Sequence, residues 1–253
     1  MKKRSHSTKK YVAAFLLFAV FFCAALLLFG SLGKRLGEET DTQRESQPNE
    51  HGVTVVIDAG HGGEDGGTVG VNGAYEKNLN LSIAKKLGKT LEAKGVNAVL
   101  TRDEDILLYD KNSDHVGHKK EQDLLNRRRI AEGYENAIFV SIHMNSFPDP
   151  KYSGLQVYYS SNDQASASLA GRIQSITRQK LMPENQRQIK KDDGSIYLLD
   201  RLNCPAVLVE CGFLSNPAEC DRLCDEGYQR DLSTCIADAI IEHINSQKDM
   251  SGT

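Results

Sequence analysis

Short apolar runs alternate with amphipathic helical stretches along the chain from residue 53 onward. From residue 78 an apolar side chain recurs every four residues, which gives a helix its buried stripe: Leu79, Ile83, Leu87 and Leu91. Buried strands are predicted at residues 53–58, 137–142 and 206–210, a further strand at 96–101, and an exposed or edge strand at 155–159. Helices are predicted at residues 78–94, 121–134, 164–180 and 229–244. Such an alternation predicts a single α/β domain with a mostly parallel, twisted sheet flanked by helices.

The first 33 residues carry a different pattern. Five cations and no acid occur among them, and the twenty residues 11–30 include no charged side chain. Twenty apolar residues rise about 30 Å as a helix, which matches the core of a bilayer. We therefore expect one N-terminal transmembrane helix within residues 11–33, with residues 1–10 as a basic tail that stays in the cytoplasm. This single-pass anchor would hold the rest of the chain at the cell membrane, on its extracytoplasmic side.

A cleaved signal peptide is the alternative for this segment. Ser31-Leu32-Gly33 offers a cleavage site with small outer residues, and cleavage would leave the domain secreted. The apolar run is longer than the roughly 7–15 residues usual in a signal peptide, which favours the anchor. Cys23 does not indicate a lipoprotein, because it lies in the middle of the run behind two phenylalanines.

Charge and composition divide the chain after residue 33 into a polar tether, a domain and a short tail. Residues 34–51 are polar and short of aromatic groups, which predicts a flexible tether. A globular domain is expected at residues 52–247, followed by a tail at 248–253. Without the five N-terminal cations, 26 Lys and Arg face 34 Asp and Glu, so the exported part has a net charge of −8. A nucleic-acid partner is not expected, because such proteins normally present a basic face.

Three side chains that can bind a metal or a proton lie at the carboxyl ends of predicted buried strands. His61 and His143 each follow such a strand within three residues, and Glu210 ends a third. Ligands of open α/β sheets bind at that edge, so we expect these three residues to converge if the strands are parallel. Glu76, which precedes the helix predicted at residues 78–94, is a fourth candidate.

Two imidazoles and one carboxylate form a common catalytic Zn²⁺ site, which leaves the fourth position for water. A further carboxylate would then carry a proton to the leaving group. Each residue also has an ordinary interpretation, since a histidine after a strand is often structural and Glu76 suits the positive end of a helix dipole. The glycines of residues 60–67 depart from G-x-G-x-x-G and are interrupted by two acids, which disfavours a phosphate site. Spacing alone leaves the metal site and the structural roles open.

Four segments occur in order along the chain: VVIDAGHGGEDGG, YEKNLNL, FVSIHMNS and PAVLVECGFLSNP. Together they resemble the zinc-dependent N-acetylmuramoyl-L-alanine amidases of bacterial cell walls, from about residue 54 to residue 244. The resemblance implies that His61, Glu76 and His143 bind zinc and that Glu210 is the catalytic residue. It also implies peptidoglycan as the substrate, cut at the amide between N-acetylmuramic acid and the L-alanine of the stem peptide.

The resemblance extends to the surroundings of the site. Asp58 or a backbone carbonyl is expected to orient an imidazole, and Arg102 and Asn145 are expected to support the site or contact the substrate. The chain most resembles the germination-specific amidases of spore-formers, whose product becomes muramic δ-lactam in the spore cortex. A muramic acid deacetylase would be the next enzyme downstream. The sequence leaves an activating protein partner open.

Two other functions also stay open at this point. A zinc peptidase that cuts within the stem peptides would use the same metal ligands, so the ligands do not exclude it. A non-catalytic wall-binding protein would normally lack a ligand or the catalytic acid, and this chain has all four residues.

Overall fold

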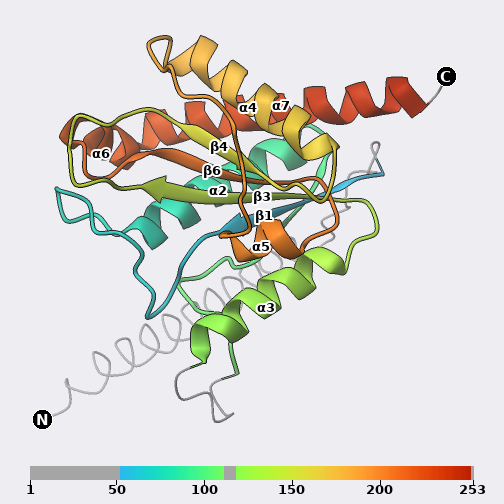
Figure 1. Ribbon diagram of the computed structural model, residues 1–253, viewed down its shortest axis with the longest axis horizontal. Helices are drawn as coiled ribbons and strands as arrows, with labels where there is room; N and C mark the ends of the chain where they lie inside the picture. Colours follow the sequence, from blue (N-terminus) through green and yellow to red (C-terminus); the bar gives the residue numbers. More distant parts are fainter. Residues whose placement is uncertain (1–51, 111–117, 252–253) are drawn as a thin grey trace, which may run out of the picture. The chain divides into compact units, whose positions relative to one another are not determined.

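A six-stranded sheet forms the centre of the described structure. The computed structural model describes residues 52–110 and 118–251. The strands are β1 (Thr54–Ala59), β2 (Asn97–Leu100), β3 (Ala137–Asn145), β4 (Gln156–Tyr159), β5 (Lys190–Lys191) and β6 (Ala206–Phe213). Their order across the sheet is β2-β1-β3-β6-β4-β5 (Figure 1).

The sheet is mixed. Strands β2, β1, β3 and β6 run parallel to one another, whereas β4 runs antiparallel to β6 and pairs with the two-residue β5. A parallel connection needs a crossover of a dozen or more residues, and only residues 146–155 separate β3 from β4, so the chain returns in the opposite direction. The predicted α/β domain with a helix-flanked sheet is thus confirmed, and its four parallel strands include all those with candidate site residues.

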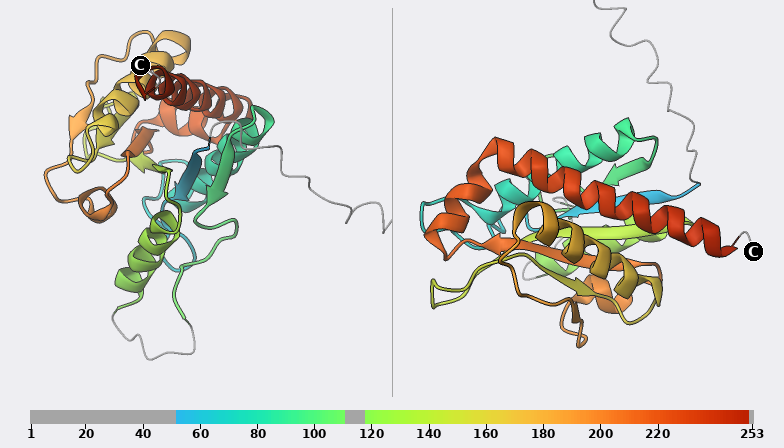
Figure 2. Two further views of the ribbon diagram at one scale, coloured as in Figure 1. Left: turned by 90° about the vertical axis from the view of Figure 1, so that its right-hand side faces the viewer. Right: turned by 90° about the horizontal axis from the view of Figure 1, so that it is seen from above.

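Helices cover both faces of the sheet. The longer helices α2 (Glu76–Ala93), α4 (Ala165–Leu181) and α7 (Glu226–Ser251) pack on one face. Helix α3 (Lys119–Glu132) and the short α5 (Tyr197–Arg201) pack on the other (Figure 2). Helix α6 (Pro217–Cys224) follows β6 and packs against α7.

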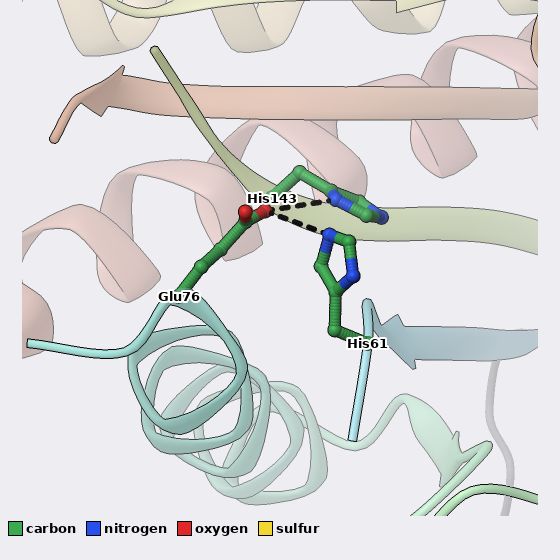
Figure 3. Close-up of side chains that lie close together, drawn as sticks. All are labelled: His61, Glu76 and His143. Carbon is green, nitrogen blue, oxygen red and sulfur yellow. Dashed lines mark hydrogen bonds and ion pairs between the residues drawn. The ribbon is translucent and has the colours of Figure 1, made fainter. Parts of the chain in front are cut away.

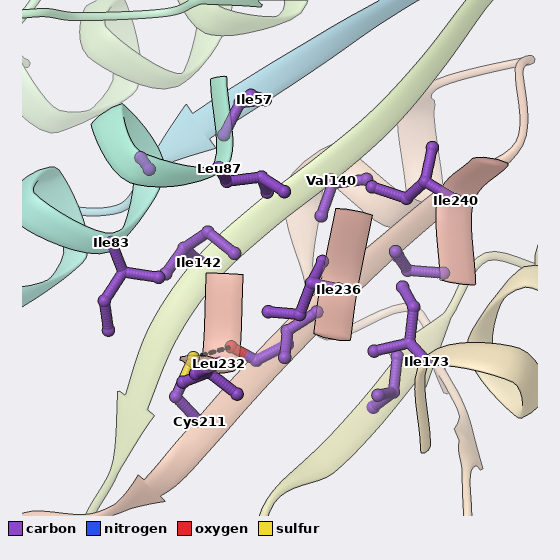
Figure 4. Packing of buried hydrophobic residues seen from close by; sticks show 14 of the residues in the cluster. Ile57, Ile83, Leu87, Val140, Ile142, Ile173, Cys211, Leu232, Ile236 and Ile240 are labelled. Carbon is purple, nitrogen blue, oxygen red and sulfur yellow. Dashed lines mark hydrogen bonds between the residues drawn. The ribbon is translucent and has the colours of Figure 1, made fainter. Parts of the chain in front are cut away.

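The alternation of side chains along the strands separates two hydrophobic clusters. The larger one joins the strands to α2, α4 and α7, and its fully buried members include Ile57, Ile83, Leu87, Val140, Ile142, Ile173, Leu232, Ile236 and Ile240 (Figure 4). Each such side chain contributes about 1.5–3 kcal/mol relative to an exposed one. The smaller cluster lies under α3 and α5 around Phe139 and Leu208.

The face under α3 and α5 changes from apolar to polar toward the carboxyl ends of the strands. On β3, Phe139 is followed on the same face by Ser141 and His143, because residues two apart share a face. On β6, Leu208 is followed by Glu210 in the same way. His143 and Glu210 are also partners in the register of the two strands. The fold therefore brings these polar side chains to one edge of the sheet.

Some elements differ from those predicted. The two-residue β5 and the five-residue α5 are too short to show a periodicity in the sequence. Helix α6 does carry a sequence signal, because Asn216 caps it and Pro217 occupies its first turn. Helix α7 begins before the predicted residue 229 and continues through Ser251, four residues into the predicted tail.

The predicted basic tail, transmembrane segment and tether at residues 1–51 lie outside the described residues. Within residues 52–110 and 118–251, none of the helices combines the length and apolar character needed to span a bilayer.

Candidate metal centre

His61, Glu76 and His143 meet at the carboxyl edge of the sheet (Figure 3). Nε2 of His61 lies 3.2 Å from Oε1 of Glu76, and Nδ1 of His143 lies 3.1 Å from the same oxygen. The two imidazole rings are in edge contact, with centroids 4.9 Å apart. One potential ligand atom from each residue lies within 4.8 Å of the other two. The structure therefore brings the three predicted metal ligands together.

The donor set of this cluster fits zinc. Two ligands held about 2.1 Å from a tetrahedral zinc ion are about 3.4 Å apart. The measured separations of 3.1 and 3.2 Å between imidazole nitrogen and carboxylate oxygen are close to that spacing. Two nitrogens and one oxygen also form a set that catalytic zinc commonly uses, with a fourth position left for water.

Glu76 is held as an anion at the start of α2. The backbone N–H groups of Thr68 and Met144 donate to its carboxylate at 2.8 and 3.1 Å. Burial raises the pKa of this carboxyl, but hydrogen bonds and charge from His143 and His61 outweigh burial and lower the pKa well below its usual range. The ionised carboxylate is the form that binds a metal.

The turn after β1 has an unusual backbone that makes room for the ligands. Among the described residues, His61 is the one non-glycine residue with a positive φ, at 61°, a strained conformation of a kind that clusters at functional sites. A Cβ on Gly60 would lie 2.2 Å from Nε2 of His143, and a Cβ on Gly67 would lie 2.6 Å from Oε2 of Glu76. The glycines of this segment thus leave space for the side chains of His143 and Glu76.

Asp65 supports His61 and was not among the predicted site residues. Its Oδ2 lies 2.9 Å from Nδ1 of His61, and the same carboxylate is paired with Lys120 of α3. Burial lowers the pKa of His61, but Glu76 and Asp65 together outweigh it and raise that pKa. Asp65 therefore acts on His61 through its charge, because Nδ1 of His61 makes no contact of hydrogen-bond geometry among the described residues. The available sequence signal was an acid four residues after the histidine.

Asp58 lies beneath the site and contacts no imidazole. Its carboxylate accepts hydrogen bonds from Thr101 at 2.7 Å, Ser141 at 2.6 Å and Arg127 at 2.7 Å. The expectation that Asp58 orients an imidazole is therefore corrected. Three other donors bind its oxygens, and Asp65 is the acid that lies next to an imidazole nitrogen. Asp58 instead joins β1 to α3 through Arg127.

Arg102 and Asn145 lie near the site in different roles. The buried guanidinium of Arg102 donates four hydrogen bonds to backbone carbonyls, those of Ala59, Gly60, Lys77 and Glu104. It therefore supports the loop that carries His61, as predicted for a supporting residue. Asn145 is half-buried at the end of β3, where its Oδ1 accepts from the backbone N–H of Ser146. Contact between Asn145 and the substrate stays a prediction.

Acid is expected to weaken the fold through Asp58. Burial raises its pKa, but Arg127 and the hydrogen bonds to the carboxylate outweigh burial and lower the pKa from 3.8 to about 2. Because the folded pKa is the lower one, this stabilisation is present above about pH 4 and disappears as the pH falls through 2. Denaturant titrations at pH 5 and at pH 2 measure how far the free energy of unfolding falls with acid in the wild type and in Asp58→Asn. The fall should be about 2 kcal/mol smaller in Asp58→Asn, which lacks the titrating carboxyl. Equal falls in both proteins would contradict the assignment.

Glu210 lies beside the cluster on the neighbouring strand. It is the register partner of His143, so the two side chains share a face of the sheet. Burial raises the pKa of Glu210 to about 7, with opposing contributions from His143, which lowers it, and Glu76, which raises it. Its Oε2 is buried without a hydrogen-bond partner among the described residues. A buried carboxylate left unpaired is unfavourable for stability, so its retention indicates a chemical role.

The described geometry coincides with a known family. A profile of the N-acetylmuramoyl-L-alanine amidases matches residues 55–242 of the chain. The chain belongs to this amidase family. It is an N-acetylmuramoyl-L-alanine amidase, and its substrate is peptidoglycan. The matched residues include all four members of the candidate site.

Relatives of this amidase include a germination-specific N-acetylmuramoyl-L-alanine amidase of Bacillus subtilis. The two are 32% identical over 198 residues, which cover 78% of this chain and 82% of the relative. The structure of the CwlD amidase from Clostridioides difficile, in complex with the GerS lipoprotein, is 38% identical with a TM-score of 0.73 and covers 77% of this chain and 99% of that one. AmiC2 of Nostoc punctiforme is 33% identical with a TM-score of 0.66, over 77% and 98% of the two chains. The predicted likeness to germination-specific amidases is thereby confirmed.

Proposed function

We propose that this amidase hydrolyses its substrate with a zinc ion held by His61, Glu76 and His143, and with Glu210 as the proton carrier. The observation that supports this most is the approach of the three ligand atoms to within 4.8 Å of one another. Glu210 adjoins them as the register partner of His143. The bond cut is the amide between the lactyl group of N-acetylmuramic acid and the L-alanine of the stem peptide.

The residues divide the work of the reaction. When bound, zinc supplies Lewis-acid polarisation of the scissile carbonyl and makes water more acidic. Glu76 and the two imidazoles would hold the ion, and the charge of Asp65 lies beside the outer nitrogen of His61. Glu210 accepts a proton from the attacking water at its unpaired Oε2 and returns it to the alanine nitrogen, which leaves as an amine.

Digestion of purified peptidoglycan by the full-length protein in detergent tests the bond that is cut. Mass spectrometry should find intact glycan without peptide, together with stem peptides that have a free N-terminal alanine. Shortened stems that stay attached to muramic acid would instead show a peptidase. Binding without any released product would show a non-catalytic wall protein.

Replacement of His61 with alanine should remove zinc from the protein. One of three ligands is lost, so the metal affinity should fall by more than the 10–100-fold typical of losing an outer-shell partner. Elemental analysis after dialysis against a weak chelator measures the bound zinc per chain. His118→Ala is the matched control, because His118 is exposed at the start of α3 and pairs with Glu121. Full zinc occupancy in His61→Ala would exclude this histidine as a ligand.

We also infer that residues 11–33 anchor the enzyme in the cytoplasmic membrane with the amidase domain outside. Twenty consecutive uncharged residues behind a basic segment support this location. Cell fractionation should then find the intact protein in the membrane fraction. Protease added to intact spheroplasts should digest the amidase domain. A soluble extracellular product would show cleavage of the segment instead.

We also propose a role in the spore cortex, which the likeness to the germination-specific relative supports. Removal of the stem peptide would expose muramic acid to a deacetylase, after which the δ-lactam closes. Deletion of the gene in a spore-forming host should leave the cortex without muramic δ-lactam, as read by muropeptide analysis. Because CwlD was solved with a lipoprotein, an activating protein partner belongs to the same proposal.

A further inference from the structure

Arg187 is a half-buried cation without an anionic partner. Among the described residues it forms no ion pair, whereas Lys151 and Arg222, which line the same cavity, pair with Asp149 and Glu219. The cavity has a volume of about 500 Å³ and is lined by the loop before β4, the loop after α4 and residues of α6. A half-buried guanidinium without a carboxylate partner indicates a place for a ligand's anion.

A row of residues connects Arg187 to the reaction centre. His143, Glu210 and Gln156 are successive register partners on β3, β6 and β4, so their side chains share one face. Oε1 of Gln156 accepts a hydrogen bond from Nη1 of Arg187 at 3.0 Å. Neighbouring strands are about 4.8 Å apart, which puts the guanidinium on the order of 10 Å from Glu210. Two peptide residues extend about 7 Å, so a stem peptide can bridge this interval.

The guanidinium is fixed before any ligand arrives. It stacks on the ring of Phe213, 4.4 Å from the centroid, and Nε donates to the carbonyl of Ser153 at 2.8 Å. The side chain of buried Asn185 holds the loop, because it accepts from the backbone N–H of Arg187 and donates to the carbonyl of Leu155. Two of the five guanidinium N–H groups are used in these contacts, which leaves three for a ligand.

The chemistry of the proposed reaction decides which part of the substrate reaches Arg187. The metal ligands lie on the side of β1 and β3, and Glu210 on β6 returns the proton to the leaving alanine nitrogen. The leaving peptide must therefore extend from Glu210 away from the metal, over β4. Arg187 lies in that direction, because it donates a hydrogen bond to Gln156, the register partner of Glu210 on β4.

We propose that Arg187 binds a free carboxylate of the stem peptide, on the second residue after the scissile amide. This inference rests on the proposed function and adds a specificity determinant to it. A planar guanidinium with free N–H groups can bind a carboxylate through two parallel hydrogen bonds, which a neutral carboxamide does not match. The enzyme should accordingly distinguish stems by the charge of their second residue.

Two synthetic muramoyl tripeptides test this inference. They differ only in whether the α-carboxyl of the second, γ-linked residue is a carboxylate or a carboxamide. The full-length wild type should cleave the carboxylate form with a kcat/KM about 10–100-fold higher, mainly through a lower KM. Arg187→Gln should lose most of this preference by losing rate on the carboxylate substrate. Arg187→Lys should keep part of it, because the charge remains without the planar fork.

Lys151→Gln is the matched control, since it removes one cation from the same cavity whose partner is Asp149. It should keep the wild-type preference. A wild type that cleaves both tripeptides equally well, or an unchanged preference in Arg187→Gln, would overturn the subsite while leaving the amidase intact. Cleavage of neither tripeptide by the wild type would overturn the proposed function itself.

Discussion

Replacing Glu210 with glutamine should lower kcat at least about a hundredfold while zinc stays bound. Glutamine has nearly the same shape, but its amide cannot take a proton from water and return it to an amine. General acid–base catalysis of this kind contributes about 10²–10⁴ in rate. Zinc should remain because Glu210 is not among the three residues whose ligand atoms meet. The rate is measured as alanyl peptide released from purified peptidoglycan, and the zinc by elemental analysis of the same sample.

The matched control for this substitution is Glu135→Gln. Glu135 is exposed just before β3, at the opposite end of the strands from the site, so its loss should leave kcat unchanged. Wild-type turnover in Glu210→Gln would exclude Glu210 as the proton carrier. Loss of zinc together with activity would instead make Glu210 part of the metal's coordination.

Replacing Arg127 with methionine should lower the free energy of unfolding by about 3–5 kcal/mol. Removal of one member of a buried ion pair leaves its partner as an uncompensated buried charge. Arg127 and its partners Asp58 and Asp123 are all nearly fully buried, and Arg127 pairs with both. Burial lowers the pKa of Arg127, but these two carboxylates outweigh it and raise the pKa, so the arginine is charged in the folded protein.

Arg127 also connects this network to the metal centre. It donates to the backbone carbonyls of Ala59 and His61, each at 2.7 Å, and so holds the turn that presents the first imidazole. Denaturant titration at pH 7 measures the loss of stability. Arg129→Met is the control, because Arg129 is exposed on the same helix and should leave the transition midpoint unchanged. A loss below about 1 kcal/mol in Arg127→Met would show that the network adds little.

Much of the candidate site was predictable because three of its four residues lie at or just after the carboxyl ends of predicted strands. His61, His143 and Glu210 each come at the end of an apolar run, and the carboxyl ends of parallel strands necessarily share an edge of the sheet. Glu76 was predictable from its place before a helix and from the family resemblance. These positions depend on local periodicity, which is visible in the chain itself.

The supporting carboxylates were harder to predict. Asp58 and Asp65 both flank His61 in sequence, and Asp58 or a backbone carbonyl was expected beside an imidazole, whereas Asp65 lies there. The choice depends on donors far along the chain, since Arg127 and Ser141 reach Asp58 from 69 and 83 residues away. No local sequence pattern shows which carboxylate will accept hydrogen bonds from such distant donors.

Hydrophobic periodicity and short motifs, which act over a few neighbouring residues, predicted every described strand except β5, the longer helices and the four residues of the candidate site. Only the packed fold shows that Asp65 lies beside His61, that Asp58 pairs with Arg127, and that Arg187 donates a hydrogen bond to Gln156. These arrangements depend on strand register and on loops that pack after the sheet has formed. Register is a long-range property, and it places side chains together that are separated by tens of residues along the chain.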